Sequence, residues 1–165
     1  MSTPRRAAVL AATATALWAL AACTSERLPT ATTPAATTRT PVREDTVRIE
    51  ITIDGQRFRA SLDDSPAGRD LVAQLPVTLE MADHGAVEKT GALPSPLSLD
   101  GQPVGADPDV GDVGYYAPGR DLVLYYGDQS FYDGIVVLGR LEGDAAQRLA
   151  AMEGTITATV AALAD

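Results

Sequence analysis

Residues 47–62 read VRIEITIDGQRFRASL, and this stretch decides the fold. Apolar side chains stand at every second position on both sides of the central Asp54-Gly55 pair, and they are Val47, Ile49, Ile51 and Ile53 and then Phe58, Ala60 and Leu62. A period of two is typical of a strand that buries one face. Asp-Gly is a preferred pair for the two-residue type I′ turn. The stretch therefore predicts a β-hairpin with one apolar face.

Two short helices are expected further along the chain. Ser65 is a good N-cap residue and Pro66 suits the first helical position, so a helix is predicted over residues 65–74. A second helix is predicted over residues 144–152, with Asp144 as its N-cap and Gly154 just beyond its end.

The rest of the sequence predicts strands and loops. Apolar runs at residues 77–81, 135–141 and 155–161 are typical of strands that face a core. Residues 83–110 hold many Gly and Pro residues, so they predict long loops with one or two short strands.

A second hairpin is expected to join residues 113–117 to residues 122–126. Gly119 suits the first position of a type II′ turn, with Arg120 as the second. The expected register pairs Ala117 with Leu122, Tyr115 with Leu124, and Val113 with Tyr126. Because these six residues are nearly all apolar, they would form one buried face.

This set of about eight strands and two short helices is largely antiparallel. A sheet of that size must close on itself or protect its edges, because open strands pair with other chains. We therefore expect a mainly β fold over residues 46–165: one closed eight-stranded barrel with the two helices over its open ends.

Three segments together resemble one known family. They are SPAGRDLVAQLP at residues 65–76, GDVGYYAP at residues 111–118 and GIVVLGR at residues 134–140. They are similar to the small prokaryotic cyclophilin-like proteins, most of which have no assigned function, and the resemblance covers residues 46 to about 160. It implies a cyclophilin-type barrel of eight strands with two helices.

The resemblance to the true peptidyl-prolyl isomerases of the cyclophilin class is much thinner. Those enzymes line a proline pocket with Arg, aromatic, Gln, Trp and His side chains. Beyond residue 22 this sequence has no Trp, two Phe and one His, His84. We assign no catalytic residue and expect no cofactor. A binding module without assigned catalysis is the favoured hypothesis, and prolyl isomerisation of exported proteins is the alternative.

The tyrosines provide the candidate ligand site. In the expected register Tyr116 and Tyr125 point away from the buried face as diagonal neighbours, and Gly114 leaves space opposite Tyr125. With Phe131 and Tyr132 of the next loop they would form a shallow surface for a proline-containing or other amphipathic ligand, since Tyr joins an apolar face to a hydroxyl. The alternative is that a helix or loop covers this face and the tyrosines only pack.

No metal site is expected. Asp83, His84 and Glu88 form the only local cluster that contains an imidazole, and a solvated loop explains them better than a metal centre. The acidic run at residues 107–112 lacks the ligands that would complete a calcium loop, so it is interpreted as a turn.

The N-terminus has the form of an export signal. Arg5 and Arg6 precede an apolar run, as in a signal peptide over residues 1–22. The tetrad Leu20-Ala21-Ala22-Cys23 resembles the lipobox of bacterial prolipoproteins, which implies a lipid on the thiol of Cys23. Cys23 is the only cysteine, so an intrachain disulfide is impossible. We expect a membrane anchor on the extracytoplasmic face, with the Sec and Tat export routes both open.

Composition limits the partners. Residues 23–45 are rich in Thr, Pro and Ala and predict a disordered tether after the lipidated cysteine.

The part of the chain after the signal peptide is strongly acidic. The whole chain has 13 Lys and Arg against 22 Asp and Glu; residues 1–22 hold two Arg and no acid, so the remainder has a net charge of −11. Such a domain is repelled by nucleic acid and by anionic surfaces. The expected partners are the membrane, through the lipid, and an exported peptide or small molecule, and the acidity favours cationic ligands.

Overall fold

The computed structural model describes residues 46–163. The predicted signal peptide, the lipid attachment site at Cys23 and the tether lie outside these residues. No helix in the described part of the chain is long and apolar enough to cross a membrane.

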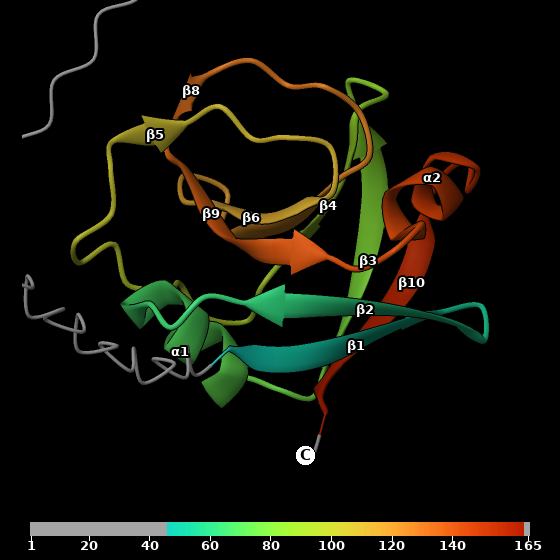
Figure 1. Ribbon diagram of the computed structural model, residues 1–165, viewed down its shortest axis with the longest axis horizontal. Coiled ribbons are helices and arrows are strands. Elements are labelled where there is room, and N and C mark those ends of the chain that lie inside the picture. Colours follow the sequence, from blue (N-terminus) through green and yellow to red (C-terminus); the bar gives the residue numbers. More distant parts are fainter. Residues whose placement is uncertain (1–45, 164–165) are drawn as a thin grey trace, which may run out of the picture. The chain divides into compact units, whose positions relative to one another are not determined.

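Eight strands close into an antiparallel barrel, as expected (Figure 1). Around the barrel they follow the order β1-β10-β3-β4-β7-β6-β9-β2. Their bounds are Val47–Ile53 for β1, Gln56–Leu62 for β2, Val77–His84 for β3, Glu88–Ala92 for β4, Asp112–Tyr116 for β6, Asp121–Tyr125 for β7, Ile135–Leu141 for β9 and Ile156–Ala162 for β10. The sequence thus predicted the fold class correctly.

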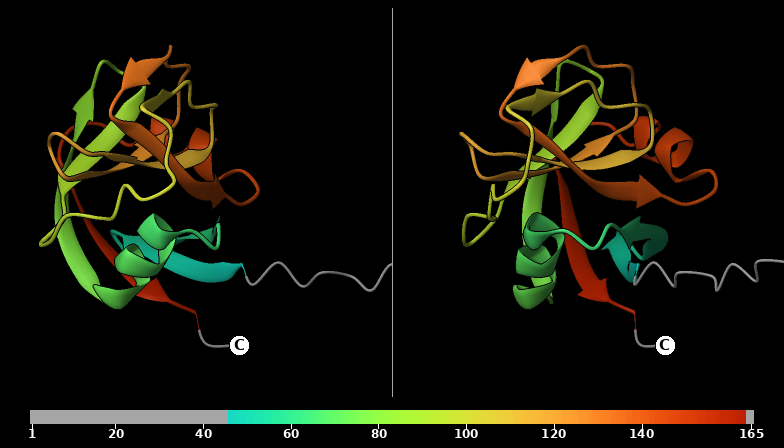
Figure 2. Two further views of the ribbon diagram at one scale, coloured as in Figure 1. Left: turned by 90° about the vertical axis from the view of Figure 1, so that its left-hand side faces the viewer. Right: turned by 60° about the vertical axis from the view of Figure 1, so that its left-hand side comes forward.

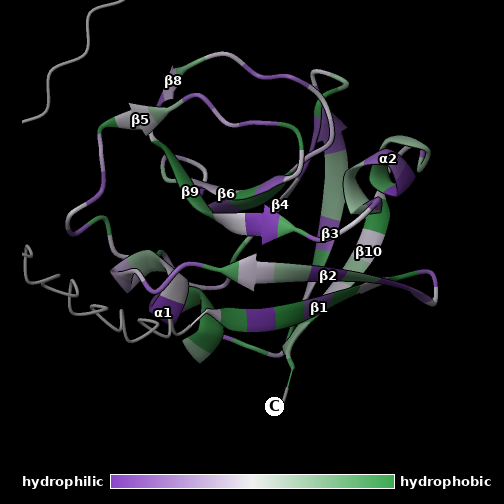
Figure 3. Cartoon of the chain, in the orientation of Figure 1, coloured by the Kyte–Doolittle hydropathy of each residue, from purple (hydrophilic) through white to green (hydrophobic). Residues whose placement is uncertain are grey.

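The β1–β2 hairpin has the predicted turn and register. Asp54 and Gly55 have φ angles of 48° and 75°, and a type I′ turn requires positive values at both positions. Ile51 pairs with Phe58, and both side chains enter the core. Apolar and polar residues alternate along both strands (Figure 3), and the apolar ones fill the barrel.

Both helices contribute to the core from the ends of the barrel. Helix α1 spans Pro66–Ala73 and begins at the predicted N-cap Ser65, whose hydroxyl accepts a hydrogen bond from the Gly68 amide. Helix α2 spans Ala145–Ala150. The strands β2 and β9 are antiparallel neighbours and each leads into one helix, so the helices lie at opposite ends.

Helix α2 is shorter than predicted. It ends at Ala150, and Gly154 lies well beyond the end. Asp144 precedes the helix, but its side chain makes no capping hydrogen bond. The reason is its backbone: ψ is 12°, whereas a capping residue needs an extended conformation to turn its side chain toward the free amides.

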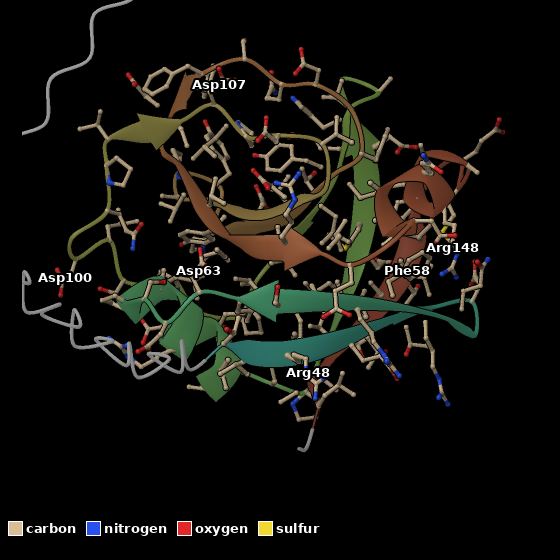
Figure 4. The ribbon with its side chains drawn as sticks, in the orientation of Figure 1. Arg48, Phe58, Asp63, Asp100, Asp107 and Arg148 are labelled. Carbon is tan, nitrogen blue, oxygen red and sulfur yellow. The ribbon has the colours of Figure 1, made fainter. Side chains whose placement is uncertain are left out.

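Arg148 fixes α2 to the first hairpin. Its guanidinium lies over the ring of Phe58, 4.3 Å from the centroid, and donates hydrogen bonds to the Arg57 carbonyl and the Gln56 side chain. Figure 4 shows Phe58 and Arg148 side by side at this corner. A cation over an aromatic face adds to the apolar packing.

The β6–β7 hairpin has a register that differs from the predicted one by two residues. Tyr115 pairs with Leu122 and not with Leu124. A shift of two residues keeps every side chain on its face, so the predicted buried face is correct. Tyr116 and Tyr125, however, are not diagonal neighbours, because the shift moves them further apart along the strands.

Pro118 explains the wrong register. The loop has four residues, 117–120, and the Arg120 amide donates to the Ala117 carbonyl at 3.2 Å, as across a β-turn. Proline favours the second position of such a turn, which places Pro118 inside the loop. Arg120 takes the positive φ, 59°, that the prediction assigned to Gly119.

A two-stranded ribbon lies on the outside of the barrel. Strands β5, Gly105–Ala106, and β8, Tyr132–Asp133, pair with each other and stand beyond β6 and β9 in Figure 1. Both views in Figure 2 show the ribbon outside the barrel wall. Ala106 packs against a small apolar cluster formed by Val123, Tyr125 and Ile135, separate from the barrel core. The ribbon therefore covers part of the outer face of the sheet.

Candidate functional site

A cavity of about 340 Å³ lies on the outer face of the barrel, next to the β5–β8 ribbon. Its lining consists of His84, Glu88, Thr90, Tyr116, Asp121, Tyr125, Gln129, Tyr132 and Ile135. The volume is at the lower end of the range of about 300–1,000 Å³ that is usual for small-molecule sites.

Strand pairing brings this lining together from distant parts of the sequence. Glu88 of β4 pairs with Tyr125 of β7, and Tyr116 of β6 pairs with Asp121 of β7 on one side and Ile135 of β9 on the other. Directly paired residues point to the same face of a sheet, so these side chains all point outward. The cavity is therefore built on rigid strands.

Three tyrosines form the aromatic part of the cavity. Tyr125 is 1% exposed, and its ring lies against Gly114, where a Cβ atom would stand 2.7 Å from the ring carbon Cε2. The rings of Tyr116 and Tyr132 have centroids 6.0 Å apart and are tilted by 59°. Tyr132 is 57% exposed and forms the rim. The sequence correctly placed Tyr116 and Tyr125 on the outer face. The prediction that Gly114 lies opposite Tyr125 and leaves space there was wrong, because Gly114 pairs with Val123 and the Tyr125 ring fills that space.

Of the four residues predicted to contact a ligand, Tyr116, Tyr125 and Tyr132 line the cavity. Phe131 is 54% exposed but is not part of the lining. The alternative, that the tyrosines only pack under a loop, applies in part, since Tyr125 belongs to the apolar cluster below the ribbon. Their role as ligand contacts stays a prediction.

His84 and Glu88 do not lie in a solvated loop, contrary to expectation. His84 ends β3, Glu88 begins β4, and the two are a direct cross-strand pair on the outer face. A short strand was expected within residues 83–110, but the segment Glu88–Ala92 has no apolar alternation that could have located it. Across residues 46–163, no three or more His, Cys, Asp or Glu side chains converge in a way that could hold a metal ion.

Glu88 is a buried carboxylate in the wall of the cavity. The residue is only 7% exposed, and its carboxylate has no hydrogen bond or ion pair with another residue between 46 and 163. Burial raises its pKa, the charge of Asp121 raises it further, and His84 acts in the opposite direction. Burial and the charges of Glu88 and Asp112 also raise the pKa of the Tyr125 hydroxyl.

Lys89, the only lysine of the sequence, points to the inside of the barrel and is fully buried. Its Nζ atom donates to the carbonyls of Met152 and Gly154 at 2.7 and 2.9 Å and lies 2.6 Å from a carboxylate oxygen of Asp83. Asp83 also accepts a hydrogen bond from the Tyr126 hydroxyl. The lysine is thus fully paired inside the barrel, on the opposite face of β4 from Glu88.

This network shifts the pKa values of Asp83 and Tyr126 in opposite directions. The hydrogen bond from Lys89 holds the pKa of Asp83 below its usual value and outweighs the opposing effect of burial, and hydrogen bonds from Tyr126 and Gly154 lower the pKa further. Burial and the neighbouring Asp83 raise the pKa of Tyr126 to about 12.

The model of the Cyclophilin-like family matches residues 51–161, two thirds of the sequence, so the chain belongs to the cyclophilin-like family. The solution structure of the hypothetical protein AF2241 from Archaeoglobus fulgidus is similar, with a TM-score of 0.54 and 18% identity, over 74% of this chain and 99% of that one. At this identity the likeness concerns the fold. No curated protein sequence matches the chain.

Asp83→Asn is expected to lower the free energy of unfolding by about 1–2 kcal/mol at pH 7, less than for a fully buried pair because the Asp83 side chain is 32% exposed. The folded-state pKa is depressed, so the stabilisation by Asp83 is present above the unfolded-state pKa and is lost as the pH falls through the folded value. Denaturant unfolding of both proteins should therefore show a difference that shrinks toward pH 2. Asp107→Asn, at an exposed position, is the control, and a difference that grew on acidification would contradict this sign.

Proposed function

We propose that this protein is a binding module that takes a peptide or small amphipathic molecule in the outer cavity and is held at the extracytoplasmic face of a membrane by a lipid on Cys23. The observation that carries the binding role is the cavity itself, in which tyrosines from β6, β7 and β8 meet. A rigid concave site with aromatic walls and a few polar groups is the usual form of a small-molecule site.

The rim supports an amphipathic ligand. Tyr132 is more than half exposed at the edge of the cavity, so its ring is accessible from outside. A ligand with an apolar part would cover this ring, while a polar part would meet the carboxylates and hydroxyls inside. The arginine at the centre of a true isomerase's proline pocket has no counterpart among the described lining residues, so binding is favoured over isomerisation.

The membrane anchor is proposed from the sequence alone. Its support is the lipobox-like tetrad that ends at Cys23 and the apolar segment before that tetrad. Cys23 lies 24 positions ahead of the start of β1, so a tether of that length would leave the barrel free to turn. An acidic domain near an anionic surface would be kept from lying flat on it.

Tyr132→Ala tests the cavity, with Phe131→Ala as the matched control, because the two neighbours are equally exposed and only Tyr132 lines the cavity. The probes are 4-phenylbutanol, 4-phenylbutyrate and 4-phenylbutylamine, which differ mainly in charge. At least one should shift the amide NMR signals of Tyr116, Asp121 and Ile135. Its affinity should fall about fivefold in Tyr132→Ala, because one aromatic contact contributes about 1 kcal/mol. It should be unchanged in Phe131→Ala, and no shift with any probe would overturn the binding role.

Cys23→Ser tests the anchor separately. Serine has no thiol for the lipid, so the variant should lose incorporation of labelled palmitate and move from the membrane fraction to the soluble fraction after export. A variant that still fractionates with membranes and still incorporates the label would contradict the proposal, whatever the outcome of the binding experiment.

A further inference from the structure

The polar part of the cavity carries negative charge. Glu88 and Asp121 both line it, and among the described lining residues only His84 is basic. Lys89, the only lysine of the sequence and the next residue after Glu88, is directed into the barrel and fully paired there, so it does not neutralise Glu88. The cavity therefore favours a cationic occupant.

The buried carboxylate of Glu88, which has no partner among the described residues, is the strongest evidence that the cavity binds a ligand. More than nine tenths of this residue is buried, its carboxylate faces the cavity, and no other described residue forms a hydrogen bond or ion pair with it. No fully buried side-chain oxygen or nitrogen among the described residues lacks a hydrogen-bond partner, so the Glu88 carboxylate is open to the cavity. Partial burial of a carboxylate without a protein partner still costs free energy. A cation that entered the cavity would supply the missing partner and relieve that cost.

An organic cation fits this site better than a metal ion. Within residues 46–163, Glu88 and Asp121 belong to no group of three or more His, Cys, Asp or Glu side chains that could hold a metal ion. The aromatic faces of Tyr116, Tyr125 and Tyr132 instead suit a cation on an apolar stem, because aromatic faces attract cations and pack against methylene groups. Glu88 is paired directly with Tyr125 across the two strands, so one group can contact both.

We propose that the cavity binds the primary ammonium group of an apolar amine and that Glu88 is its anionic partner. This inference rests on the proposed binding function and names the chemistry of the ligand. A primary ammonium has three N–H donors, which match the carboxylates and hydroxyls of the lining. The same chemistry occurs in free amines and in the side chain of a lysine on an exported peptide.

The test measures affinity by isothermal titration with two matched pairs of probes. 4-Phenylbutylamine against 4-phenylbutanol represents free amines, and acetyl-Phe-Lys-Phe-amide against acetyl-Phe-norleucine-Phe-amide represents peptides. In at least one pair the charged member should bind about tenfold or more tightly than the neutral one, because it forms a desolvated charge pair. The pair with the tighter charged member identifies the source of the ammonium group.

Glu88→Gln supplies the second arm, with Glu142→Gln as the control because it removes the same charge from an exposed position outside the cavity. Glu88→Gln should lower the affinity for the charged probe about tenfold and leave the neutral probe unchanged, whereas Glu142→Gln should change neither. The thermal unfolding midpoint of Glu88→Gln should not fall below that of the wild type, because this substitution removes a buried charge that has no partner.

The outcomes separate this inference from the proposed function. If neutral and charged probes bind equally to the wild-type protein, or if Glu88→Gln binds the amine as well as the wild type, the ammonium proposal is overturned while the binding function stands. If no probe of any charge binds, both fall. The comparison of charged and neutral probes in the wild-type protein does not depend on whether Glu88→Gln folds.

Discussion

The alternation of side chains along each strand is the constraint on which the whole structure depends. In a closed barrel one face of every strand lies inside, and the eight strands fill that interior with a single apolar core. The other face is free to carry polar and aromatic groups. The core and the cavity are therefore two faces of the same sheet, and the register that places Tyr115 inside also places Tyr116 outside.

The same alternation separates charges at the β3–β4 turn. Asp83 and Lys89 point inward as a pair, and their neighbours His84 and Glu88 point outward as another. The inner pair is closed, because the lysine also binds two carbonyls from the segment after α2. The outer pair is open, because Glu88 is buried without a hydrogen bond among the described residues. One pair stabilises the fold, and the other leaves a carboxylate for a ligand.

Local signals predicted the elements well, and pairing between distant strands was harder to predict. The Asp54-Gly55 turn and the Ser65-Pro66 helix start depend on neighbouring residues, so the sequence was sufficient for both. The β6–β7 register was wrong because Pro118 moved the turn. A short strand was expected somewhere in residues 83–110, but β4 could not be located, since Glu88–Ala92 pairs on both sides without an apolar pattern of its own. The tyrosines were found, but Glu88, which faces them, lies on that strand.

Strand β4 directs Lys89 into the barrel and Glu88 into the outer cavity. An NMR titration of the side-chain carboxyl carbons in the wild-type protein tests this placement. Glu88 should titrate above the ordinary glutamate pKa of 4.5, because its carboxylate is partly buried without a described partner, and Asp83 should titrate below the ordinary aspartate pKa of 3.8, because Lys89 donates to it. If Glu88 titrated below its ordinary value, or Asp83 above its own, this distribution of charge between the two faces would be contradicted.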